Sequence, residues 1–574
     1  MYTCIILHNM IFTDEGPEAG NWFDPETPGS STASSPPRSG VHPSMQDQLS
    51  IRAMTPNRKT LSPSMGRTAV ASVVTLCLIP VHLIVNRFVP DPYMDEIFHV
   101  PQAQHYCRGN FTSWDPLITT PPGLYFLSLA YIASLFPGLF CMRAVPSFSD
   151  SCSTSILRLN NGVLSVVCSI LVYEIIIHLR PSLDDKIATF RAVVLSLYPL
   201  HWFFSFLYYT DVASLTAVLA MYLLVLKKKY IFSSLLGTVS VLVRQTNIIW
   251  LLFAACTGVI EFAQSHLKDR EEEIDKVRTA MQNDDFSDIH KGFTVNSKLR
   301  KRRVNNGVRN QKKHAVATLN PMEHSSGLLD EIYSIVIISW NHLLEILVLL
   351  SPFLMVFAAF VAFVCWNGSI VLGAKDAHAV SPHFAQFLYY GVVSSLFTFP
   401  IHFSFGQAAT LSHQLLKNRL LGFLQGFMAL ALAFLSVKYF SIAHPYLLAD
   451  NRHYPFYLWR KVINRHWSTK YLMIPFYIYS WFSIVCNLAK NQKKLWVLVY
   501  VLACAATLIP TPLIEFRYYT IPFFFMVLHT DIIDNISWLL LGFLYLCINF
   551  FTMYMFLFRP FSWAHEAGTQ RFIW

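Results

Sequence analysis

The stretch VPDPYMDEIFHVPQAQHY, residues 89–106, places two adjacent carboxylates, Asp95 and Glu96, directly after a long apolar run. If this stretch is helical, the two acids point about 100° apart, whereas Asp95 and His99 share a face at the i, i+4 spacing. Pro101 lacks the amide that continues a helix, so the shared face is expected to end at His99. Only one of the two acids can therefore aim into a given cavity. We predict that Asp95 is this acid and that His99 lies beside it.

The same loop closes with SWDPLITTPPGLYF, which adds Asp115 and two threonines before a predicted helix. Thr119 or Thr120 is a suitable N-cap, because a proline can occupy the first helical position without losing a hydrogen bond. Such a helix start aims free backbone N–H groups and a partial positive charge at the loop, and these would bind an anion. A loop carboxylate can equally cap a helix or pair with an arginine. The gathering of ionisable groups at membrane depth nevertheless favours a functional site.

The composition predicts a membrane protein. The 574 residues are 54% hydrophobic and only 14% charged, against roughly 25% charged in ordinary globular domains. Apolar runs long enough to cross a bilayer, which takes ~20 residues each, recur from about residue 69 to residue 558. We predict an all-α polytopic membrane protein of about 12–14 transmembrane helices. The candidate spans are centred near residues 78, 127, 167, 219, 237, 255, 354, 393, 429, 479, 502, 526 and 547.

The basic residues predict the orientation. The net charge is +10, and residues 264–314 hold 13 basic and 8 acidic residues. Their KLRKRR cluster could bind nucleic acid, but a basic loop between spans is explained by the positive-inside rule. We therefore predict that 264–330 is a cytoplasmic loop, that the KKK motif at 227–229 lies on the same side, and that nucleic acid is no partner. Asp95 and the RQTN motif that starts at Arg244 then lie on the lumenal side.

One segment complicates the count of crossings. Residues 187–207 are apolar and aromatic but contain Pro199 and His201. A full span there would reverse the sidedness of everything after it. We predict that the segment is re-entrant or lies at the lumenal interface, where aromatic residues are common, which leaves thirteen spans.

The cysteines and the glycosylation motifs say little about function. The eleven cysteines are scattered, mostly in apolar segments, and form no C-x-x-C motif, so the sequence predicts neither a zinc site nor a disulfide framework. No cluster with metal-ligand spacing occurs, and no metal or cofactor is expected. The NFT and NGS motifs at Asn110 and Asn367 fall on the predicted lumenal side, where they permit an N-linked glycan.

Residues 1–64 differ from the rest of the chain. The segment SSTASSPPRSGVHPS is rich in serine and proline and is expected to be disordered. The opening CIILHNMIFTDEG resembles the tail of plant transposase-derived nucleases, without their catalytic residues. We therefore interpret 1–64 as an extension from a fused gene model and 65–574 as the membrane domain, which starts at Met65 with no cleavable signal peptide.

Six blocks carry a resemblance to a known family. They are PYMDEIFHVPQAQHYCRGNFTSWDPLITTPPGLYFLSL, FFSFLYYTD, VLVRQTNIIW, HPYLLADNRHYPFYLWRK, LIEFRYYTIP and GTQRFIW. Together they resemble the dolichyl-phosphate-glucose-dependent α-1,2-glucosyltransferases of the endoplasmic reticulum, over about residues 70–574. These enzymes add the third, terminal glucose to the lipid-linked oligosaccharide of N-glycosylation. The resemblance implies a multi-pass GT-C fold in the endoplasmic reticulum membrane with a lumenal active site. It also implies a catalytic acid in the first lumenal loop, so Asp95 and Glu96 are carried over as the catalytic residues, Asp95 as base and Glu96 as its neighbour.

The implied reaction inverts the anomeric carbon, because a β-linked donor gives an α-glucoside. It therefore needs one general base and no covalent intermediate. Asp95 would take the proton from the acceptor's 2-hydroxyl as that oxygen attacks. The partners implied are dolichyl phosphate glucose, the dolichyl-diphosphate oligosaccharide acceptor and membrane lipid.

The departing lipid phosphate favours fixed cations or amide donors. Arg244 and Arg517 are the candidates, since each arginine stands at a predicted lumenal end of a span and its planar fork suits phosphate. Each could equally pair with a carboxylate such as Glu515. Gln245 and Asp211, which stand at lumenal ends of neighbouring spans, complete the candidate substrate-binding set on this side.

The segment ADNRHYPFYLWRK, residues 449–461, mixes aromatic rings with Arg452 and His453. Such a mixture suits sugar rings, although an aromatic belt at the membrane interface would have the same composition. Two other readings of the whole chain stay open. A transporter of lipid-linked sugars would share the spans and basic loops, and a sister GT-C enzyme would add a different sugar.

Overall fold

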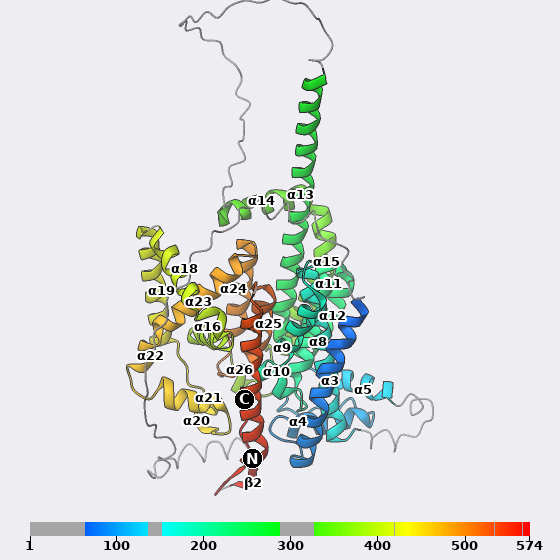
Figure 1. Cartoon of the computed structure of the whole chain (residues 1–574). Coiled ribbons are helices and arrows are strands. Elements are labelled where there is room, and N and C mark those ends of the chain that lie inside the picture. The colour runs from blue at the N-terminus through cyan, green and yellow to red at the C-terminus, as the bar shows by residue number, and fades with distance from the viewer. Residues whose placement is uncertain (1–62, 136–151, 288–326, 418, 533, 565) are drawn as a thin grey trace, which may run out of the picture.

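In the computed structural model the chain forms a bundle of long helices with one small antiparallel hairpin at one end (Figure 1). The structure describes all residues except 1–62, 136–151, 288–326, 418, 533 and 565. The predicted extension 1–64 thus lies outside the described residues apart from its last two, where helix α3 (Pro63–Phe88) begins. The predicted all-α membrane fold is confirmed.

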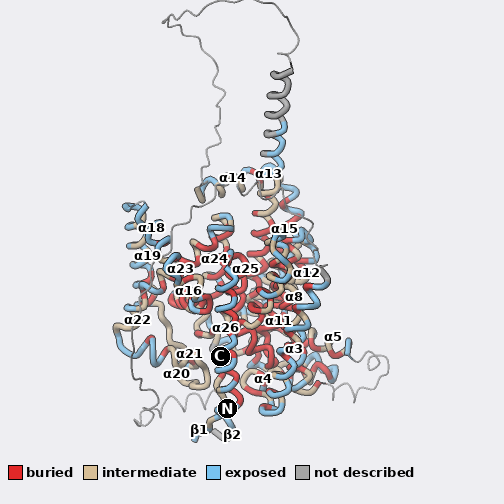
Figure 2. The backbone as a smooth tube through the Cα atoms, in the orientation of Figure 1, coloured by how far each residue is buried: buried red, intermediate tan, exposed pale blue. Residues whose placement is uncertain are grey.

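Helix α11 (Thr210–Leu226) lies at the centre of the larger group of helices. It is apolar around its whole circumference and almost every residue is buried, as expected of a helix enclosed by others (Figure 2). It packs against α8, α12 and α13. The group consists of α3, α8 (Thr154–Leu179), α9 (Asp185–Ser196), α10 (Pro199–Phe204), α11, α12 (Tyr230–Val243), α13 (Ile248–Ser287), α14 (Leu328–Asn341) and α15 (Leu343–Asn367).

A second group is built around α16 and α23, which pack against each other and against α19. Its contact with the first group includes α24, which touches both α13 and α16. The group consists of α16 (Phe384–Phe397), α17 (Phe399–His402), α18 (Phe405–Lys417), α19 (Arg419–Tyr439), α23 (Ile474–Ala489), α24 (Lys494–Leu508), α25 (Thr520–His529) and α26 (Asn535–Phe558).

The helices differ in whether they are long enough to cross a membrane. Among the described residues, seven are long and apolar enough, judged by length and composition. They are Met65–Phe88, Thr154–Leu179, Gln245–Arg270, Leu343–Asn367, Arg419–Tyr439, Thr469–Ala489 and Asn535–Phe558. Every predicted span centre falls within a helix, but the others lie in shorter ones of 10–17 residues. A multi-pass protein is confirmed, whereas the count of thirteen full spans stays a prediction.

The bundle has two chemically different ends. The turn Lys227–Lys229 and the charged extension of α13 lie at one end, which we call the basic end (Figure 1). The opposite end, which we call the site end, carries Asp95 and Arg244 together with short helices and the hairpin. These elements are α4 (Glu96–Cys107), α5 (Gly123–Leu135), η1 (Gln245–Asn247), η3 (Asp376–His378), α20 (Pro445–Ala449), α21 (Tyr454–Leu458), the π-helical turn η4 (Trp459–Ile463), α22 (Thr469–Leu472), η5 (Phe516–Tyr519), β1 (Phe561–Trp563) and β2 (Glu566–Gln570). In the hairpin, Phe561 pairs with Gln570 and Trp563 with Glu566.

Two local predictions near the site were wrong. Helix α4 continues through Pro101 to Cys107, because the missing amide removes only one hydrogen bond while the helix packs on α5. Helix α5 begins at Gly123, so neither predicted threonine caps it. A residue before a proline is biased away from helical angles, and here two prolines follow each other. The carbonyl of Pro122 accepts the amides of Tyr125 and Phe126, so Pro122 stands immediately before the helix.

Two longer segments also depart from simple spans and loops. Residues 187–207 form no single helix, because α9 ends at Ser196 and α10 starts with Pro199 at its first position. A re-entrant or interfacial position of this segment stays a prediction. The first part of the predicted loop 264–330 is helical, since α13 continues to Ser287. Opposite charges at i, i+4, such as Glu272 and Lys276, support a solvated helix there. Residues 288–326 lie outside the described part of the chain.

The structure contains a disulfide that the sequence did not predict. Cys107, the last residue of α4, pairs with Cys152, just before α8. The two cysteines are 45 residues apart and carry no local signature, so their connectivity cannot be deduced from spacing. The bond lies at the site end and ties the loop that carries Asp95 to the start of α8.

Candidate active site

The turn between α3 and α4 separates the two adjacent acids. Met94 has a left-handed backbone with φ of 57°, which is uncommon for a residue other than glycine, and Asp95 takes the N-cap position of α4. After this turn Glu96 is fully buried, whereas the side chain of Asp95 stays 38% exposed. As predicted, only one of the two acids remains accessible, and it is Asp95.

Glu96 is an anchor for the loop that precedes it. Its carboxylate accepts hydrogen bonds from Arg158 Nε at 2.8 Å and Nη2 at 2.5 Å, and from the backbone amides of Tyr93 and Tyr208. Arg158 also donates to two backbone carbonyls of the loop 89–91. Every one of these partners belongs to the protein, and the side chain is closed to solvent. We therefore propose that Glu96 positions the loop, in place of the predicted catalytic role.

Asp95 shares an arginine with a second acid. Arg517, in η5, donates from Nη1 to Asp95 Oδ2 at 2.7 Å and also forms a two-point ion pair with Glu515. Burial by itself would raise the pKa of both carboxyls, but the charge of Arg517 outweighs burial and leaves both below their ordinary values. Both acids are therefore ionised at neutral pH. The predicted alternative, in which Arg517 pairs with Glu515, is observed.

Arg244 has a different set of partners. It donates from Nη1 to Asp211 Oδ1 and from Nη2 to Thr210 Oγ1, both at 2.9 Å, and its guanidinium lies 6.0 Å from the ring centre of Tyr518. Asp211 stands in the first turn of α11, where a negative charge is favourable. Its second oxygen lies 3.9 Å from Arg517. The two predicted arginines are thus linked through one carboxylate.

Two further predicted residues of this region, His99 and Asp115, have different surroundings. His99 lies on α4 below Asp95, with Nδ1 2.7 Å from the hydroxyl of Tyr125, and burial lowers the pKa of His99 to about 4. Its imidazole is therefore neutral at neutral pH. Asp115 instead accepts the amide of Leu117 within its own turn, which is a loop-shaping role.

The two threonines lie beside the site without capping a helix. The carbonyl of Thr119 accepts Nε2 of Gln245 at 3.0 Å, which joins the first loop to η1. The hydroxyl of Thr120 is buried and has no hydrogen-bond partner among the described residues. Neither threonine thus caps α5, and an anion site at the start of this helix stays a prediction.

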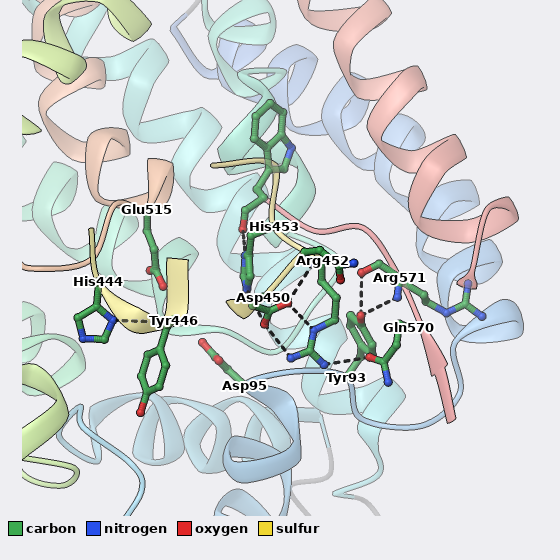
Figure 3. A network of polar contacts seen from close by, with 12 residues as sticks. Tyr93, Asp95, His444, Tyr446, Asp450, Arg452, His453, Glu515, Gln570 and Arg571 are labelled. Carbon is green, nitrogen blue, oxygen red and sulfur yellow. Dashed lines mark hydrogen bonds and ion pairs between the residues drawn. The ribbon is translucent and has the colours of Figure 1, made fainter. Parts of the chain in front are cut away.

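The segment that follows α20 brings further predicted residues to the same end (Figure 3). Arg452 forms a two-point ion pair with Asp450, at 2.8 and 2.7 Å. His453 Nε2 lies 3.8 Å from the same carboxylate, and His453 is close enough to influence the ionisation of Asp95 and Glu515. The structure thus gathers residues from four distant parts of the chain around Asp95.

A group of side chains of the types that bind metals lies outside the candidate active site. His266, His342 and Glu345 lie near the basic end, with one ligand atom of each within 4.8 Å of the others, and all three are partly exposed. His342 is hydrogen-bonded to Glu345 at 3.0 Å. We assign no metal role to the three.

Sequence reasoning missed two residues that shape the site and named a third only as an alternative. Arg158 lies within a predicted span, and a charged residue there is itself a signal of function. Glu515 was considered only as an alternative partner of an arginine. Tyr93 gave no signal, because its hydroxyl bonds to Arg571, 478 residues away along the chain.

Comparison with known proteins agrees with this arrangement. The sequence matches the DIE2/ALG10 family over residues 89–528, which include both Asp95 and Arg517. The chain belongs to this family. It is 55% identical to an Arabidopsis thaliana protein called Dol-P-Glc:Glc(2)Man(9)GlcNAc(2)-PP-Dol alpha-1,2-glucosyltransferase, over 89% of this chain and all of that protein. It is 32% identical to a human protein and 30% identical to a Drosophila melanogaster protein of the same name, with 94% and 96% of those proteins covered. No solved structure matches the chain.

Proposed function

We propose that this protein transfers glucose from dolichyl phosphate glucose to the terminal glucose of Glc(2)Man(9)GlcNAc(2)-PP-dolichol, forming an α-1,2 bond with inversion. The observation that carries this proposal is the 55% identity to a relative of that name along its whole length. The gathering of Asp95, two arginines and two further acids at one end supports it independently, since these groups suit the chemistry.

Asp95 is the general base. An inverting transfer needs a carboxylate that can reach the attacking hydroxyl, and Asp95 is the most exposed acid of the cluster, at 38% against 7% for Asp211 and 12% for Glu515. The leaving group is a phosphodiester that is already ionised, so a general acid is not needed. What the reaction needs is positive charge near the departing phosphate.

Arg244 is the better candidate for the phosphate. Arg517 already faces three carboxylates, whereas the ion pair of Arg244 is with Asp211 alone among the described residues. The two arginines and three acids together carry one net negative charge. An incoming phosphate therefore gains Arg244 by displacing Asp211 from it. Asp95, the most exposed of the three acids, leaves Arg517 in a separate step, when it accepts the proton.

The acceptor approaches from the side of Arg452 and His453. Guanidinium and imidazole groups next to aromatic rings suit the hydroxyls and faces of sugars. This places the terminal glucose of the acceptor between that segment and Asp95.

The site end faces the lumen of the endoplasmic reticulum. Three observations support this orientation. The Cys107–Cys152 disulfide lies at that end, and disulfides persist in oxidising compartments. The basic residues Lys227–Lys229 lie at the other end, as expected for the cytosolic side. Asn110, in a glycosylation motif, is exposed in the first loop.

The function is tested by expressing the protein in cells that lack the terminal glucosyltransferase and analysing the lipid-linked oligosaccharide by mass. Restoration of the third glucose is expected. A change at the first or second glucose, or at a mannose, would indicate a sister enzyme. Purified protein that moves lipid-linked sugars across vesicles but makes no glycosidic bond would indicate a transporter.

A further inference from the structure

Residues 570–574, which we call the strap, link two loops that carry candidate active-site residues (Figure 3). The first is the base loop, residues 89–95, which ends in Asp95. The second is the sugar-facing loop, residues 450–454. The strap begins at the last residue of β2 and forms hydrogen bonds with both loops.

The strap is bound to the base loop by a double hydrogen bond. The hydroxyl of Tyr93 donates to the carbonyl of Arg571 and accepts its backbone amide, each at 2.7 Å. The Arg571 side chain donates to the carbonyls of Phe556 and Leu557 at the end of α26, and to that of Phe88 at the end of α3. The strap is therefore held to two long helices and to the residue two positions before Asp95.

The same strap binds the sugar-facing loop through backbone and side chain. The amide of Ile573 donates to the carbonyl of Arg452 at 2.9 Å, and the amide of Tyr454 donates to the carbonyl of Ile573 at 3.1 Å. His453 Nδ1 lies 3.0 Å from the carbonyl of Trp574. The buried side chain of Gln570 accepts Arg452 Nη1 at 2.9 Å through its Oε1 atom.

We propose that the strap is a positioning element of the active site, which fixes the sugar-facing loop relative to the base loop and so sets how the acceptor hydroxyl meets Asp95. This inference rests on the proposed function, in which Arg452 and His453 contact the acceptor. Catalytic groups on loops reach the required precision only when surrounding hydrogen bonds hold them, and an error of ~1 Å can cost ~10²-fold in rate. The donor phosphate meets Arg244, on a different element, so the strap acts on the acceptor alone.

The first test uses Gln570→Leu, which keeps the size of the side chain but removes the oxygen that holds Arg452. Steady-state kinetics of the full-length protein in lipid nanodiscs, with dolichyl phosphate glucose and purified acceptor, give each substrate its own KM. We expect kcat/KM for the acceptor to fall at least ~10-fold with the donor KM unchanged. Gln570→Glu keeps an oxygen that accepts from Arg452, so its kcat/KM for the acceptor should be close to that of the unmodified protein.

The second test uses Tyr93→Phe, which removes one hydroxyl from the strap. Its matched control is Tyr222→Phe, which removes a buried hydroxyl bonded to His529 at 2.8 Å, away from the site. Only Tyr93→Phe should lower turnover of the acceptor, at a similar Tm for the two variants. An equal fall of kcat/KM for the donor and for the acceptor would overturn the inference. So would a fall in Tm large enough to account for the whole loss of activity. So would unchanged kinetics of Gln570→Leu beside an active unmodified protein. If the unmodified protein makes no glycosidic bond, the proposed function falls, and the strap's role falls with it.

Discussion

Two arginine–carboxylate pairs start from adjacent residues, yet they lie in very different surroundings. Glu96 and Arg158 are both fully buried, and the carboxylate also accepts two backbone amides. Asp95 is 38% exposed, and its partner Arg517 is shared with other acids. The first pair is closed to solvent and saturated, whereas the second is open and can exchange partners. An arginine–carboxylate pair therefore stabilises the fold in the first case. In the second case, in our proposal, it takes part in the chemistry.

The largest effect is expected from breaking the closed pair. Glu96→Ala leaves the Arg158 guanidinium buried without its carboxylate, which typically costs ~3–5 kcal/mol of folding free energy. The thermal unfolding of detergent-solubilised protein measures this loss. The matched control is Glu174→Ala, which breaks the more exposed pairs with Arg67 and Lys227 and should cost ~1 kcal/mol or less. Similar Tm values for the two variants would show that the buried pair is no anchor.

The next effect concerns the open pair. Asp95→Asn keeps the shape and most hydrogen bonding of the side chain but removes the base, so kcat should fall at least ~10²-fold. Because the carboxylate is partly exposed, the Tm should change little. Transfer to purified acceptor at close to the normal rate would exclude Asp95 as the base.

The contrast between these pairs was partly visible in the sequence. The i, i+4 relation of Asp95 and His99 and the divergence of Glu96 follow from helix geometry alone. The burial of Glu96 does not, because it depends on Arg158 from a helix that starts 58 residues later along the chain. Local pattern thus predicted which acid is accessible but not what holds its neighbour.

The other features that the sequence did not predict depend on contacts between residues far apart in the chain. The link between Asp95 and Arg517 spans 422 residues, and that between Tyr93 and Arg571 spans 478. Hydrophobic periodicity predicts helices well, since each depends on residues a few positions apart. It does not predict which loops meet at one end of a bundle. The contacts of the strap with the two loops could therefore not be predicted from the sequence.

A smaller effect tests whether the other arginine of the cluster binds phosphate. Arg244→Lys keeps the charge but loses the planar fork, and Arg244→Gln loses both. We expect transfer to fall ~10-fold for lysine and ~10²-fold for glutamine, since one preorganised donor is worth about that much. Titration of the donor separates a higher KM, which reports ground-state binding, from a lower kcat, which reports stabilisation of the transition state. Normal kinetics of a folded Arg244→Gln protein would mean that this arginine only braces Asp211.

The smallest effect comes from His99, which shares α4 with Asp95 but titrates in a different range. Burial lowers the pKa of His99 to about 4 from an ordinary 6.5, and the charged groups around it are Asp95, Arg517, Arg244 and Asp211. Between these two pH values the unfolded chain binds a proton at this position that the folded chain does not. The stability contributed by neutral His99 is therefore complete above about pH 6.5 and is lost as the pH falls toward 4.

Asp95 contributes mainly below that window, because its pKa is lowered from an ordinary 3.8 and its stabilisation is lost as the pH falls through and below that value. His99→Gln keeps a hydrogen-bonding side chain opposite Tyr125 but removes the titrating ring. The Tm of this variant should decline less steeply than that of the unmodified protein between pH 6.5 and 4, and the two slopes should agree above pH 7. Parallel curves throughout the window would mean that the pKa of His99 is the same in the folded and the unfolded chain, so that the folded protein gains no stability from a neutral imidazole. The interpretation of His99 as a buried, neutral partner of Tyr125 would then be wrong.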